Sequence, residues 1–87
     1  MVSREAFNVI AEELEYAFAQ EYGEKFPGIV VFDAFTDELL YIGNDQKIVV
    51  NYMEWVDQYP YLGLDEYKSF IEEKIRTEFL NDKKAQD

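Results

Sequence analysis

Apolar side chains recur at helical spacing near both ends of the chain, and shorter apolar runs lie between these two segments. The first segment predicts a helix over residues 4–22, because its apolar positions fall on one side at 100° per residue. These positions are Phe7, Ile10, Ala11, Leu14, Phe18 and Tyr22. Ser3 is the predicted N-cap, and Gly23 follows the helix where a left-handed C-cap favours glycine.

Three runs rich in β-branched and aromatic residues come next, and each predicts a strand. They are GIVVF at 28–32, ELLYIG at 38–43 and KIVVNY at 47–52. The segments AFTD and GNDQ separate them and supply turns, and EKFPG connects the first helix to the first strand. The pattern therefore predicts an antiparallel meander.

Alternation along these strands predicts two sheet faces, and both are largely apolar. One face is expected to carry Val30, Phe32, Leu40, Ile42, Ile48 and Val50, and the other Ile29, Val31, Leu39, Tyr41 and Val49. Two arrangements stay open. The helices cover opposite faces, or both lie on one face and leave the second as a dimer or target interface.

The last part of the chain predicts two more helices. MEWVDQYP at 53–60 is expected to form a short helix that ends before Pro60 and is anchored by Trp55. Asp65 is the predicted cap of a longer helix that runs to about residue 80. Its apolar side comprises Tyr67, Phe70, Ile71, Ile75 and Phe79. Its charges are expected to pair at helical spacing, as Glu72 with Arg76, Lys74 with Glu78 and Asp65 with Lys68.

The predicted fold class is therefore α+β, with an N-terminal helix, a three-stranded antiparallel β-meander, a short helix and a C-terminal helix. A chain of 87 residues is expected to form a single domain, 1–87, because its length suffices for one modest core. Residues 82–87 are expected to be a frayed tail.

Charge changes the picture most. The chain has 19 acidic and 8 basic residues, a net charge of −11, and the whole imbalance lies in residues 1–67. Phosphate contacts require Lys and Arg, so direct nucleic-acid binding is disfavoured. The 15 aromatic residues are too many for a disordered acidic tail, so the chain is expected to fold despite its charge.

The residue types exclude several kinds of chemistry. The chain has no cysteine and no histidine, which rules out histidine acid–base catalysis and Ser–His or Cys–His nucleophile pairs. DAFTDELLYIGND lacks the ligand pattern of a calcium loop. We expect no enzyme, no catalytic residue, no metal site and no cofactor. The start of the chain has charges within its apolar stretch, and no apolar run reaches the ~20 residues of a membrane helix. We therefore expect a cytoplasmic protein without a membrane partner.

Acidic and aromatic residues are mixed in a way that favours a protein-binding surface. EWVDQYPYLGLDEY at 54–67 combines one Trp, three Tyr and four carboxylates with no Lys or Arg. Tyrosines flanked by carboxylates suit a basic partner, although a solvated acidic face that only keeps the protein soluble has the same pattern. The candidate partner-binding residues are Glu12, Glu13, Tyr16, Asp33, Asp37, Glu38, Asp45, Glu54, Asp57 and Tyr61.

A small, strongly acidic α+β chain without Cys or His resembles the phage-encoded inhibitors that mimic DNA, including anti-CRISPR proteins. The element order is similar to that of one family of Cas9-inhibiting anti-CRISPR proteins. The likeness covers the layout of the chain and carries no motif, so no residue role is transferred. It implies carboxylates that occupy a Lys- and Arg-rich groove, which in Cas9 includes the arginines that recognise the PAM. It also implies action in the cytoplasm of a host cell.

Two hypotheses follow. The first is an inhibitor that masks a basic nucleic-acid-binding surface, with a Cas nuclease as one such target. The alternative is a non-enzymatic structural or interaction module that forms a homodimer through an apolar sheet face.

Overall fold

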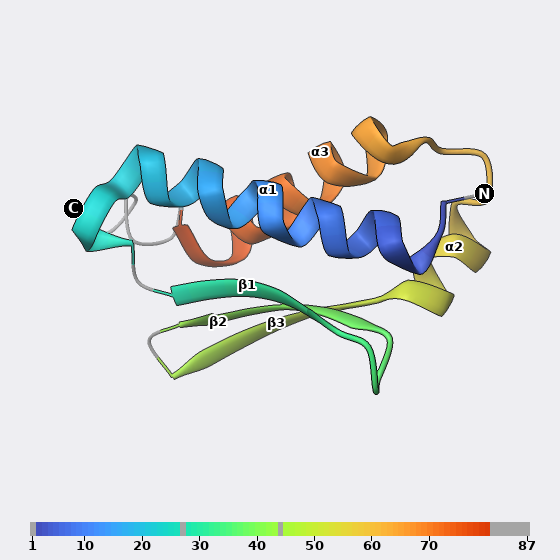
Figure 1. Cartoon of the computed structure of the whole chain (residues 1–87), viewed down its shortest axis with the longest axis horizontal. Helices are drawn as coiled ribbons and strands as arrows, with labels where there is room; N and C mark the ends of the chain where they lie inside the picture. Colours follow the sequence, from blue (N-terminus) through green and yellow to red (C-terminus); the bar gives the residue numbers. More distant parts are fainter. Residues whose placement is uncertain (1, 27, 44, 81–87) are drawn as a thin grey trace.

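The computed structural model describes residues 2–26, 28–43 and 45–80, and its architecture is the predicted α+β order (Figure 1). The tail predicted at 82–87 lies outside these residues. The elements are α1 (Arg4–Tyr22), a 3₁₀ turn (Gly23–Lys25), β1 (Gly28–Asp33), β2 (Glu38–Gly43), β3 (Gln46–Asn51), α2 (Tyr52–Gln58), α3 (Leu64–Ile75) and a π-helical turn (Arg76–Leu80). No helix in the described segments is long and apolar enough to cross a bilayer.

The helix ends follow local chemistry. The Ser3 hydroxyl accepts a hydrogen bond from the Ala6 N–H at 3.2 Å, and Gly23 is the C-cap, so both predicted capping residues of α1 are confirmed. Gly23 has a positive φ of +60°, but its ψ of −136° differs from the predicted left-handed helical conformation. The predicted cap of α3 is wrong. Gly63 is the N-cap, and its N–H donates to the Glu66 carboxylate at 3.2 Å. Glu66 is the third helical residue, where a carboxylate can bond back to the first free amide.

The strands form one antiparallel sheet in the order β1-β2-β3, but the predicted faces are wrong. The four-residue turn between β1 and β2 pairs Asp33 with Glu38. Even positions of β1 therefore share a face with odd positions of β2. The buried face carries Val30, Leu39, Tyr41, Ile48 and Val50. Leu40 and Ile42 belong to the opposite face, with Ile29, Val31 and Val49; these five residues are called the open face below.

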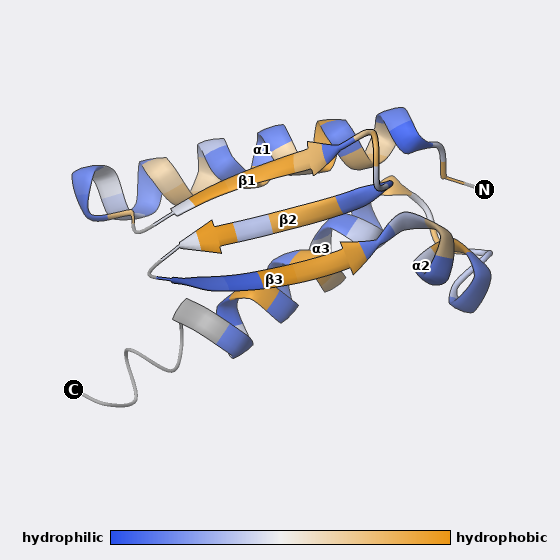
Figure 2. Ribbon diagram, turned by 90° about the horizontal axis from the view of Figure 1, so that it is seen from below, coloured by the Kyte–Doolittle hydropathy of each residue, from blue (hydrophilic) through white to orange (hydrophobic). Residues whose placement is uncertain are grey.

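Both long helices lie on the same side of the sheet (Figure 1). This is the second of the two arrangements left open by the sequence. Ile29, Val31, Ile42 and Val49 of the open face are 37–48% exposed, and Figure 2 shows the hydrophobic strands with the helices behind them. Nothing in the described chain covers the open face.

The core lies between the helices and the buried face of the sheet. From α1 it takes Phe7, Ile10, Ala11, Leu14 and Phe18, and from α3 it takes Tyr67, Ile71 and Ile75. Ion pairs bridge the outer edges of the two helices. Arg76 binds the Glu21 carboxylate with two nitrogens, at 2.7 and 3.0 Å, and Lys68 lies 3.2 Å from Glu13. The predicted Lys68 pair with Asp65 is therefore wrong, whereas the pairs of Glu72 with Arg76 and Lys74 with Glu78 are confirmed.

The short helix α2 is held to the core mainly by Tyr52 and Val56, which are 5% and 6% exposed. The Tyr52 hydroxyl donates to the Val2 carbonyl at 2.7 Å. Trp55, the predicted anchor, is half-buried and packs at the edge of the core against Tyr59 and Tyr67. Tyr52, Trp55 and Val56 therefore share the anchoring of α2, because this helix contacts the core at the edge of the core.

The buried Tyr41 is expected to lower the stability of the fold at alkaline pH. Its side chain is fully buried, and this burial raises the pKa of its phenol to about 12. Above pH 10 the unfolded chain loses this proton before the folded chain does, so the tyrosine's contribution to stability falls as pH rises from 10 to 12. Between pH 8 and pH 11 we expect Tyr41→Phe to reduce the alkaline loss of unfolding free energy by about 1 kcal/mol. Urea unfolding at pH 8 and pH 11 measures the effect, and equal alkaline losses in both proteins would contradict it.

Candidate protein-binding surface

Most of the negative charge is gathered at one end of the molecule. The start of α1, the turn between β1 and β2, the helix α2 and the start of α3 all meet there (Figure 1). We call this region the acidic end and define it by eight carboxylates: Glu5, Asp33, Asp37, Glu38, Glu54, Asp57, Asp65 and Glu66. Among the described residues Arg4 is the one base that accompanies them, so the acidic end carries seven of the eleven net negative charges.

The charges are nearly balanced at the opposite end of the molecule, where α1 and α3 finish and β2 turns into β3. We call this region the balanced end. Its acids are Glu21, Glu24, Asp45, Glu72, Glu73 and Glu78, and its bases are Lys25, Lys47, Lys74 and Arg76. The molecule is 39 Å long, and the two ends are therefore separated by several screening lengths of about 8 Å at physiological ionic strength. A charged partner would distinguish one end from the other.

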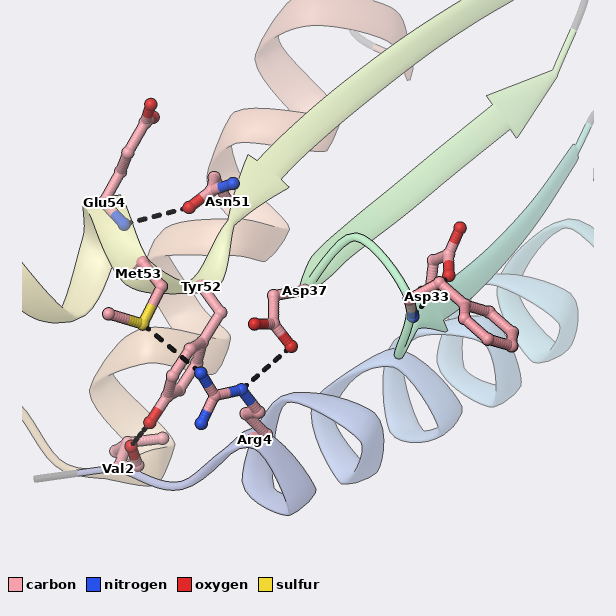
Figure 3. A network of polar contacts seen from close by, with 9 residues as sticks. Val2, Arg4, Asp33, Asp37, Asn51, Tyr52, Met53 and Glu54 are labelled. Atoms are coloured by element: carbon pink, nitrogen blue, oxygen red, sulfur yellow. Dashed lines mark hydrogen bonds and ion pairs between the residues drawn. The ribbon is translucent and has the colours of Figure 1, made fainter.

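Two of the candidate carboxylates have local structural roles within the acidic end. The Arg4 guanidinium donates to Asp37 at 2.9 Å and to the Met53 sulfur at 3.5 Å, and it lies over the Tyr52 ring (Figure 3). The hydrogen bond to Asp37 raises the pKa of Arg4. Asp33 accepts the Phe35 N–H at 2.9 Å and thereby shapes the turn. Asp37 also has φ of +56°, a backbone conformation that Asp tolerates better than most residues.

Three other candidate carboxylates carry no side-chain bond of this kind in the structure. Glu54 and Asp57 are exposed on α2, and Glu38 is half-buried at the start of β2. The backbone N–H of Glu54 donates to the side-chain oxygen of the N-cap Asn51 at 3.0 Å, while the Glu54 carboxylate extends away from this cap into solvent (Figure 3). These side chains can meet a basic partner without breaking a described contact.

Large apolar side chains are exposed among these carboxylates. Phe35, at the tip of the turn between β1 and β2, is fully exposed, Tyr61 is 96% exposed and Met53 is 55% exposed. Tyr61 was predicted from the sequence, whereas Phe35 and Met53 were missed. For Phe35 the available signal was an aromatic residue within a turn segment, where no core position is expected. Aromatic and Met side chains are enriched at protein interfaces.

Two shallow grooves flank these exposed side chains. The first has a volume of about 350 Å³ and is lined by Arg4, Glu5, Asn8, Phe32, Ala34 and Asp37. The second has a volume of about 310 Å³ and is lined by Met53, Val56, Asp57 and Pro60. Both suit single side chains of a partner. Among the described residues, no group of three or more Asp or Glu is arranged to hold a metal ion.

The structure places the remaining candidates elsewhere. Glu12, Glu13 and Tyr16 lie on the outer face of α1, where Tyr16 is 68% exposed and Glu13 is paired with Lys68. Asp45 lies in the turn at the opposite end, with φ of +63°. The ten predicted residues therefore form one group of six at the acidic end, a group of three along α1 and one residue far from both.

Comparison of this chain with protein-family models, with curated proteins and with solved structures finds no match. The chemistry of its surface is therefore the basis for assigning a function.

Proposed function

We propose that this chain is a non-enzymatic, protein-binding inhibitor whose acidic end masks a basic nucleic-acid-binding surface of a target protein. The observation that carries the proposal is the placement of seven of eleven net negative charges at one end. A nucleic acid offers its target a dense row of negative charges, and a folded carboxylate surface offers the same sign without the bases.

The exposed apolar side chains give the acidic end a means of holding its target. Charge alone accelerates association and selects the partner, but affinity depends on a few buried anchors. Phe35 and Tyr61 are exposed at nearly their full surface, so each would bury a large area on docking. The target we expect has a Lys- and Arg-rich groove with apolar hollows at its edge. Cas nucleases, which bind a guide–target duplex in a positively charged channel and read the PAM with arginines, are one class of such target.

A capture experiment tests this function. The full chain is immobilised and exposed to a nuclease-treated bacterial lysate at low and at high salt, and captured proteins are identified. We expect a nucleic-acid-binding protein at low salt, its loss at high salt because screening weakens the long-range attraction, and its release by duplex DNA or RNA. A captured protein that binds saturating nucleic acid and this chain together would overturn the proposal.

A further inference from the structure

Charged residues are distributed unevenly along the strands on the side of the sheet that carries the open face. The register places the five open-face residues and four polar residues on the same side of the sheet, in three rows: Ile29, Ile42 and Lys47; Val31, Leu40 and Val49; and Asp33, Glu38 and Asn51. Five of the nine positions are branched aliphatic residues. The single base stands in the row nearest the balanced end, and the two acids stand in the row that belongs to the acidic end.

We infer that this face pairs with the same face of a second copy, with the strands of the two copies running in opposite directions. Each copy then covers the aliphatic rows of the other, which the helices leave open because both lie on the far side of the sheet (Figures 1 and 2). Sheets packed in this way lie about 10 Å apart. The contact is isologous, so it closes with two copies.

The uneven distribution of charge along the chain favours a dimer with opposed strands. A chain with a net charge of −11 repels a second copy, and the repulsion is strongest between the two acidic ends. Opposed strands place those ends at opposite extremes of the dimer, beyond a screening length of about 8 Å at physiological ionic strength. Strands running in the same direction would place Glu38 of one copy near Glu38 of the other.

Opposed strands also bring opposite charges together. Lys47 of one copy comes to lie over the row that contains Glu38 and Asn51 of the other copy. Within one chain Lys47 and Glu38 cannot pair, because Lys47 stands opposite Ile42, which is four residues from Glu38 along β2, or about 13 Å. Any coupling between these two residues is therefore a contact between copies.

The size of the face sets the strength of the pairing. Three strands of six residues cover a footprint of roughly 280 Å² per copy, against the ~800 Å² of a standard interface. We therefore expect a reversible dimer whose population rises with protein concentration. Screening reduces the repulsion between like-charged copies while apolar burial persists, so added salt strengthens this dimer. Target binding through the acidic end has the opposite salt dependence.

Sedimentation equilibrium of the full chain over a concentration series tests the inference. We expect Val49→Thr to weaken the dimer about tenfold, because it places an unpaired hydroxyl in the contact of each copy. Val9→Thr is the matched control. It makes the same change at a similarly exposed position on α1 (40% against 37%), and it should leave the dimer unchanged. A chain that is monomeric at every concentration and salt, or two variants of equal effect, would overturn the pairing.

A charge exchange tests the direction. Lys47→Glu and Glu38→Lys are each expected to weaken the dimer severalfold, and the double variant, which keeps the net charge of −11, is expected to restore it. Both side chains lie outside the core, so the folded monomer should persist, and far-UV circular dichroism checks this. If Val49→Thr does not fold, the charge exchange between Lys47 and Glu38 alone tests the proposed dimer. If the double variant does not restore the dimer, the arrangement with opposed strands is wrong. The proposed function is judged separately, by whether binding of a basic target is lost at high salt.

Discussion

Replacing Phe7 with alanine is expected to lower the free energy of unfolding by about 3–5 kcal/mol. Phe7 has no exposed surface and lies where α1, the sheet, α2 and α3 meet. Its ring contacts Tyr52 edge-on at 5.1 Å between centroids, Tyr67 at 5.7 Å and Phe32 at 6.3 Å. The substitution removes all three contacts and leaves a cavity that rigid neighbours cannot fill. Urea unfolding followed by circular dichroism measures the loss.

Phe35→Ala is the matched control for this prediction. It removes the same atoms from a ring that is fully exposed at the tip of the β1–β2 turn, so we expect a change below about 0.5 kcal/mol in the free energy of unfolding. Equal losses in the two variants would show that the core is not where the structure places it. The control has a second use, because Phe35→Ala should weaken target binding while Phe7→Ala, where still folded, should not.

The elements were predictable because their signals are local. The apolar residues of α1 repeat at three and four positions, Ser3 and Gly23 mark its ends, and each strand has a β-branched run between turn residues. These features act within a few residues of the chain. The structure keeps all of them, with small shifts such as the start of α3 at Leu64.

The sheet faces were not predictable from the same signals. Every strand has apolar residues at both odd and even positions, so the alternation does not say which set is buried. The answer depends on the length of the β1–β2 turn, which moved Leu40 and Ile42 to the open face. The placement of α1 and α3 on one side depends on contacts between segments far apart in sequence, such as Arg76 with Glu21.

The candidate surface was predicted in composition and only partly in position. The acids of the turns and of α2 were among the ten candidate partner-binding residues, and the structure brings six of the ten to one end. Asp45 lies in a turn as expected, but the turn is at the opposite end. Composition identifies an acidic surface, whereas only the path of the chain decides which acids share it.

Reversing two charges at the acidic end is expected to weaken target binding by about 10- to 100-fold, because each reversal replaces an attraction with a repulsion at a close charge pair. The variant is Glu54→Lys with Asp57→Lys. Both side chains are exposed on α2, and neither is needed for the core. Binding of the captured target, measured by calorimetry at physiological ionic strength, gives the change in Kd, and thermal unfolding confirms that the fold is retained.

The matched control is Glu24→Lys with Glu73→Lys, at the balanced end. It alters the net charge from −11 by the same amount, also at exposed positions. If the target responds only to the total charge of the chain, both variants lose the same affinity, and the acidic end is no more than a solubilising surface. If the acidic end is the docking surface, the control keeps its affinity within about threefold at physiological ionic strength, because a charge more than one screening length from the contact has little effect on it. The difference between the two Kd values therefore measures how far the placement of the carboxylates, rather than their number, determines recognition.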